Sequence, residues 1–396
     1  MPSLRNPTEA QRRSMADALR MSALLAERAA VNDPGSVFPH ENYKTLHEAG
    51  YLRSFLPTRL GGDGASVFDI VLSQEILARG CASTALVAGM HFSLLGRVID
   101  ANAWPDHVLA TVCETTIRHG GTINNCVTEA ELGSISRGGL PNMKAERADG
   151  GWRLTGRKIF VTGAPVLRYL ATAVVLPPSD AAPTGELVSA IVDGTEAGLS
   201  IEDTWSGALG LRGCGNYDVV YDRVFVPDSM IVERLPIGDH RRPQGGSAWA
   251  LPLAAGTLGV GQAALDTAKH YANTRTPAAL GQPIASQPHI QQWIGEMEVK
   301  LRAARALLHD TARACAAGEI APSEMAPTVA AADSPEVDSE EPFQTLESQN
   351  AAAAQFNRGN IRFKNKDSQS AEDSGESPPA VVRRPVAGVR ITRLRS

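Results

Sequence analysis

The sequence predicts an α+β protein in which a sheet region lies between two helical regions. Apolar residues recur every three to four positions across residues 8–101, which is the spacing of one helix face. The spacing changes toward every second residue between 121 and 232, as in strands, and becomes helical again from 254 to 308. The predicted domains are an N-terminal helical domain at 1–120, a middle antiparallel β-barrel or sandwich domain at 121–235, and a C-terminal helical domain at 245–330.

Composition and charge narrow the class of protein. The chain has 396 residues, of which 43% are hydrophobic, enough for a large core. Its net charge of −5 argues against a nucleic-acid partner. The five cysteines are scattered and form no Cys-x-x-Cys pair, which favours a reducing compartment without disulfides or a metal site. We expect a cytoplasmic protein without a secretory signal or membrane span, because charged residues interrupt every long apolar stretch.

The first two helices are predicted at residues 8–31 and 38–50. Thr8 and Gln11 have the spacing of a capping box at the start of the first helix. Pro34-Gly35 follows its end, as expected for a chain that turns.

A third helical stretch spans residues 67–101. Glu75 and Arg79 are spaced for an ion pair within this helix. The stretch 82–95 is nearly uncharged and is therefore predicted to be buried. His91 lies within it and has two interpretations, a core histidine that donates to a carbonyl or a proton donor or base that faces a ligand pocket.

The middle and C-terminal elements follow the same rules. Strands are predicted at 171–176, 187–192 and 217–226, where β-branched and apolar residues alternate between turn signals. A helix is predicted to begin near Leu253, and a later helix carries an apolar face from Ile290 to Leu308.

Two polar strand ends in the middle region suggest a cofactor site. The first is Asn124-Asn125-Cys126-Val127-Thr128-Glu129, followed by Gly133-Ser134, and the second runs from Trp152 to Gly163 with Thr162 near its end. An isoalloxazine ring needs hydroxyl and backbone donors at its edge and flat or apolar groups on its faces. Either segment alone is weak evidence, because a threonine at a strand end is usually only a strand end.

Together and in this order, the two segments resemble the flavin signatures of the acyl-CoA dehydrogenase family. Ala130-Glu131-Leu132 departs from the usual Pro-Gly-Ala, and Phe160 replaces the commoner tryptophan. The resemblance implies FAD as cofactor and a homo-oligomer, a tetramer or dimer. The residues it implies for FAD binding are Asn125, Val127, Thr128, Ser134, Phe160, Thr162 and, reaching the pyrophosphate of a neighbouring subunit, Arg275.

The resemblance further implies oxidation of an acyl-CoA-type thioester, with a carboxylate removing the α-proton and flavin N5 accepting hydride. The usual glutamate is not found at either customary position: Trp249 and Ala250 stand near the start of one helix, and the polar stretch 331–396 offers no equivalent. That stretch is predicted to be a disordered or aberrant tail, so the C-terminal bundle is expected to be incomplete. His91 remains the catalytic candidate.

Two alternatives stay open. One is a flavin-dependent monooxygenase on the same fold, resembling the dibenzothiophene-desulfurising branch, in which His91, Asn125 and Thr162 are similar in position to residues near the flavin. The other is an inactive, truncated member of the family.

Overall fold

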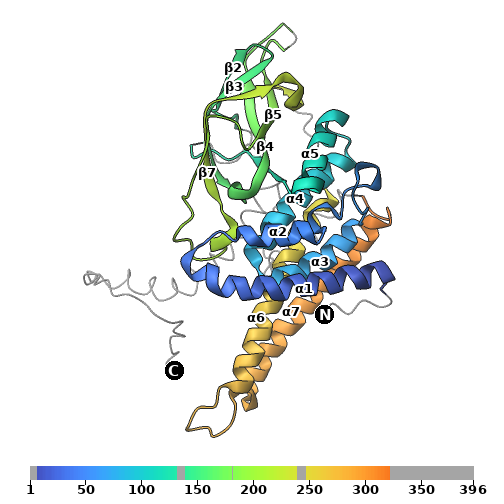
Figure 1. The fold of residues 1–396 in the computed structure, drawn as a ribbon. Coiled ribbons are helices and arrows are strands. Elements are labelled where there is room, and N and C mark those ends of the chain that lie inside the picture. The colour runs from blue at the N-terminus through green and yellow to red at the C-terminus, as the bar shows by residue number, and fades with distance from the viewer. Residues whose placement is uncertain (1–6, 132–138, 181, 239–246, 322–396) are drawn as a thin grey trace, which may run out of the picture. The chain divides into compact units, whose positions relative to one another are not determined.

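The described part of the chain contains two helical groups and two β-sheets (Figure 1). The computed structural model describes residues 7–131, 139–180, 182–238 and 247–321, all within the compact unit Met1–Ala352. Ser134 and the predicted tail at 331–396 lie outside the described residues. The helices are α1 (Glu9–Asn32), α2 (His40–Glu48), α3 (Val67–Gly80), α4 (Ala82–Asp100), α5 (Asp106–His119), α6 (Leu251–Thr274) and α7 (Pro288–Ala316).

The start of α1 confirms the predicted capping box. The Gln11 backbone N–H donates to the Thr8 hydroxyl at 3.1 Å, and the Thr8 N–H donates to the Gln11 side chain at 2.9 Å. This signal is reliable because both partners lie within one turn.

The helical stretch predicted at 67–101 is divided into α3 and α4 at Cys81. Cys81 is extended, with φ −154° and ψ 103°, and so ends the first helix. Gly80 packs against α1 so closely that a Cβ atom there would overlap with the Ser22 carbonyl. The chain therefore bends where the backbones of α1 and α3 meet.

The predicted Glu75–Arg79 pair is wrong. Arg79 Nη2 instead contacts Asp266 on α6 at 2.8 Å. The Glu75 carboxylate, only 2% exposed, accepts from Arg305 Nε at 2.7 Å and contacts His309 Nε2 at 2.9 Å, both on α7. Glu75 pairs with residues of α7 rather than with Arg79 because those residues approach it inside the core, where charges interact more strongly than on the surface.

The eight strands among the described residues form two four-stranded sheets. One sheet has the order β1-β4-β5-β8 and the other β2-β3-β7-β6. The strands are β1 (Thr122–Cys126), β2 (Lys144–Ala148), β3 (Gly151–Val161), β4 (Leu167–Leu176), β5 (Glu186–Asp193), β6 (Leu199–Glu202), β7 (Tyr217–Pro227) and β8 (Ile231–Pro236).

The α+β class is confirmed, but the middle region is not wholly antiparallel. β1 and β4 are parallel neighbours, whereas the other paired strands run antiparallel. The chain leaves β1, forms β2 and β3 in the other sheet, and returns as β4. Parallel neighbours require a crossover of this kind, which alternation of apolar residues within a strand does not reveal.

One core joins the N-terminal helices to α6 and α7, and it includes Ile123 of β1 and Ala171 of β4. A second core fills the space between the two sheets. Two helical stretches, Ala82–Asp100 and Ala248–Thr274, are long and apolar enough to cross a membrane. The apolar character of α4 is accounted for by its burial against α3, α6 and β1.

Candidate functional site

The two polar segments that the sequence singled out meet where β1 ends. The Ile159 backbone N–H donates to the Thr128 carbonyl at 3.0 Å. The Asn124 side chain donates to the Thr162 carbonyl at 3.1 Å. Because β1 and β3 belong to different sheets, these bonds join the two sheets at one place.

A buried ion pair lies beside this junction. Lys158 Nζ is 2.6 Å from Glu129 Oε1, and the Lys158 side chain has no exposed surface. The Glu129 carboxylate also accepts from the backbone N–H groups of Asn142, at 2.7 Å, and Met143, at 3.3 Å. Burial lowers the pKa of Lys158, and the Glu129 carboxylate opposes that shift.

Phe160 adopts an unusual backbone conformation at the same junction. Its φ is +55°, in the left-handed region that a non-glycine residue rarely occupies. The β3–β7 register shifts between Lys158 and Val161, so Phe160 lies in a β-bulge. Phe160 is 50% exposed, and its ring meets Trp205 edge-on, with 6.1 Å between the centroids.

The structure brings together most of the predicted cofactor residues. Asn125, Val127 and Thr128 are partly exposed at and just beyond the end of β1, whereas Thr162 is buried. These residues meet the segment that carries Phe160, because Thr128 accepts from the N–H of Ile159, the residue before it. This set fits a flavin, which needs hydrogen-bonding groups at its edge and a flat or apolar group on one face.

Arg275 does not join this group within the chain. It follows the last residue of α6, where its N–H donates to Tyr271 and its carbonyl accepts from Ile284, at 2.9 and 3.0 Å. The opposite end of α6 packs on α4, where Leu253 fills the space beside Gly89. The 24 residues of α6 span about 36 Å, and Figure 1 shows α6 and α7 extending together to the loop that joins them.

His91 lies beneath the start of β1 and is fully buried. Its Nε2–H faces the Leu52 carbonyl at 3.2 Å, and its Nδ1 accepts from the Ile123 N–H at 3.3 Å. Burial lowers the pKa of His91 to about 4, although the bond to Leu52 favours the charged form. This geometry matches the core-histidine interpretation, and the catalytic interpretation stays a prediction.

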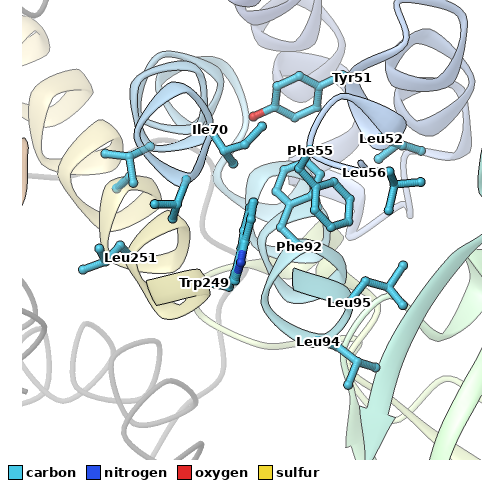
Figure 2. Close-up of a cluster of buried hydrophobic side chains, with 14 of the residues drawn as sticks. Tyr51, Leu52, Phe55, Leu56, Ile70, Phe92, Leu94, Leu95, Trp249 and Leu251 are labelled. Atoms are coloured by element: carbon cyan, nitrogen blue, oxygen red, sulfur yellow. The ribbon is translucent and has the colours of Figure 1, made fainter. Parts of the chain in front are cut away.

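Trp249, at the position where the family resemblance places a carboxylate, is part of the helical core (Figure 2). Its ring centroid is 5.3 Å from that of Phe55, and its Nε1–H donates to Asp100 at 2.8 Å. The indole packs on Gly96, where a Cβ atom would overlap with the ring. Burial raises the pKa of Asp100, and the bond from Trp249 opposes that shift.

Asn124, Glu129 and Lys158 were included only as members of the two polar segments and not as site residues, and Trp205 was missed. Lys158 carried a usable signal, because it shares the inward-facing alternation of β3 with Leu154. In the part of the chain that the structure describes, no three His, Cys, Asp or Glu side chains gather to hold a metal ion.

Helical groups flanking two small sheets, with a flavin-compatible junction between the sheets, define a class of flavin-dependent oxidoreductases. Three family profiles match the chain in order: the acyl-CoA dehydrogenase N-terminal domain at residues 6–106, the middle domain at 124–224 and the C-terminal domain at 250–332. The "Putative acyl-CoA dehydrogenase YdbM" of Bacillus subtilis is 38% identical over 304 residues, covering 76% of this chain and 77% of that protein. The chain therefore belongs to the acyl-CoA dehydrogenase family and is an acyl-CoA dehydrogenase-like flavoenzyme.

Solved structures agree with this fold. Butyryl-CoA dehydrogenase from Megasphaera elsdenii matches with a TM-score of 0.70 at 20% identity, covering 83% of this chain and 85% of that chain. TdsC from Paenibacillus sp. A11-2, solved with FMN and indole, matches with a TM-score of 0.71 at 19% identity, covering 81% and 82%. At these identities the likeness shows the fold alone.

Proposed function

We propose that this chain binds FAD at the junction of β1 and β3 and uses it to oxidise an acyl thioester of the CoA type. The observation that carries the proposal is the convergence of the two polar segments, joined by the bonds from Ile159 to Thr128 and from Asn124 to Thr162. When bound, FAD would accept hydride at N5.

Different residues at the junction would contact different parts of the flavin ring. Asn125 and Thr128 would supply hydrogen bonds at its edge, because they are partly exposed at the end of β1. The half-exposed ring of Phe160 would cover one face, and Trp205 would support Phe160 from the side. Preorganised donors of this kind cost little rearrangement when a ligand binds.

We further propose that the chain forms a homo-oligomer through α6 and α7. Tyr271, Trp293 and Met297 are 46%, 52% and 39% exposed, and Trp293 and Met297 lie one turn apart on α7, so they share a face of that helix. A second copy would cover them, and it would also allow Arg275 to reach the FAD of its neighbour. Sedimentation velocity tests this, and a monomer at micromolar concentration would contradict it.

A flavin-dependent monooxygenase is the second candidate, and Trp249 is the observation that favours it. A dehydrogenase needs a base for the α-proton, whereas Trp249 presents a buried indole at that position. Oxygenation requires no such base. The TdsC structure with indole shows that a protein of this fold can be solved with FMN and an aromatic heterocycle.

Anaerobic titration of the FAD-loaded protein with short-chain acyl-CoA separates the candidates. Loss of the oxidised flavin absorbance within one turnover supports thioester oxidation. Persistence of that absorbance, together with transfer of one oxygen atom to an indole-type substrate from reduced flavin and oxygen, supports the monooxygenase. A chain that retains no flavin after loading contradicts both and identifies an inactive family member.

A further inference from the structure

The ion pair between Glu129 and Lys158 is a costly way to fill the space between two sheets. An ammonium group loses its hydration when it is fully enclosed, and one carboxylate restores only part of that loss. Apolar side chains of similar size often stabilise such a position equally well or better. The best-attested use of a buried polar pair is instead to select one register over others.

The register shifts beside Lys158, at one of the two irregularities in the pairing of β3 with β7. Lys158 stands opposite Val219 and Val161 opposite Tyr217 on β7. Three steps along β3 therefore match two steps along β7, which leaves one extra residue to accommodate. Phe160 takes the left-handed conformation within this interval.

Glu129 offers Lys158 a fixed partner because its carboxylate is held by two backbone N–H groups, those of Asn142 and Met143. A slip of one residue in β3 would turn the side chain at position 158 to the opposite face of the sheet. The ammonium group would then lose Glu129. The pair therefore specifies the present register and penalises the slipped one.

We propose that Glu129 and Lys158 form a positioning pair that fixes the β3 bulge and thereby presents Phe160 to the cofactor, an inference that rests on the proposed flavin function. Neither side chain needs to touch the flavin for this effect. The buried Lys158 side chain fixes the register of β3, and that register determines where Phe160, two residues later, lies at the surface.

The test uses the full chain and compares three variants. Glu129→Gln with Lys158→Met removes both charges, so the chain keeps its fold without an unpaired buried ion. Phe160→Ala removes the presented ring. Glu146→Gln is the matched control, because Glu146 lies on β2 beside β3 and its ion pair with Arg223, at 2.8 Å, joins two side chains that are each 59% exposed.

Two measurements are made on each variant. Hydrogen exchange of the Ile159 amide, measured without FAD, reports the junction itself, and the double variant should exchange at least about tenfold faster. FAD titration reports the consequence, and both the double variant and Phe160→Ala should bind about tenfold more weakly. Glu146→Gln should leave both quantities at the wild-type value, and Phe160→Ala should leave the exchange rate unchanged.

Combining the changes tests whether the pair acts through Phe160. Adding Phe160→Ala to the double variant should then alter the FAD dissociation constant by less than about twofold. A full additive loss would overturn the inference, as would a double variant that binds FAD like wild type. If wild type itself binds no FAD, the proposed function fails and takes this inference with it, whereas normal wild-type binding confines the failure to the pair.

Discussion

The buried neutral state of His91 predicts a specific loss of stability in mild acid. The imidazole has no exposed surface, and its Nδ1 accepts a hydrogen bond from the Ile123 N–H that a protonated ring could not accept. The perturbation is a fall in pH from 7 to 5, applied to wild type and to His91→Gln. A glutamine amide can still donate to Leu52 and accept from Ile123, but it does not titrate.

The magnitude follows from the depressed pKa. Folding lowers the pKa of His91 from 6.5 to about 4, so the unfolded chain takes up a proton first as pH falls. The stability from this group is complete above pH 6.5 and is lost as pH falls toward 4. One pKa unit is worth about 1.4 kcal/mol, which gives a loss of about 2 kcal/mol between pH 7 and pH 5 and about 3 kcal/mol by pH 4.

Urea unfolding of the apo-protein, followed by tryptophan fluorescence at both pH values, measures this loss. Wild type should lose about 2 kcal/mol more than His91→Gln over the interval. Other groups titrate in both proteins and cancel in the difference. Equal losses in the two proteins would refute the assignment of His91 as a neutral core residue and would support a ring accessible to solvent or ligand.

Two further changes test the packing and the helix network. Gly96→Ala should lower the free energy of unfolding by about 2 kcal/mol in thermal unfolding, because the new Cβ would overlap with Trp249. Gly256→Ala is the control, and it should raise that free energy by about 1 kcal/mol, because the space around Gly256 is open. Equal effects of the two substitutions would contradict this account. Glu75→Gln should cost about 3 kcal/mol at pH 7 by leaving Arg305 without its carboxylate. Burial alone would raise the pKa of Glu75, but its partners lower it overall, so this cost should shrink as pH falls below about 4. A cost that is independent of pH would argue against a charged Glu75.

Features determined by neighbouring residues were predicted well. The capping box of Thr8 and Gln11 is an example, because both partners lie within one turn. The order of the regions, helical, then strands, then helical, also followed, since each has its own apolar spacing. Helix α5 and strands β2, β6 and β8 were not predicted. The two polar segments were identified as one site because they resemble a known signature, not because spacing alone placed them together.

Features determined by distant residues were not predicted. Glu75 pairs with Arg305 rather than Arg79 because a helix more than two hundred positions later packs beside it. The parallel pairing of β1 with β4 depends on a crossover, and apolar alternation within β1 contains no information about its neighbour. The left-handed conformation of Phe160 likewise depends on the register with β7, which lies outside any local pattern.

The position of the junction between the two sheets makes the stability of the newly made chain depend on whether a flavin is bound. A ligand held by both β1 and β3 binds only when both sheets are formed, so its binding energy adds to the cooperativity of the whole middle region. At a free ligand concentration one hundred times its dissociation constant, this adds about 2.7 kcal/mol to the free energy of unfolding. The fraction of newly made chains lost to proteolysis and aggregation would therefore fall as the flavin concentration in the cell rises. The supply of cofactor would set not only the active fraction of the protein but also how much of it survives.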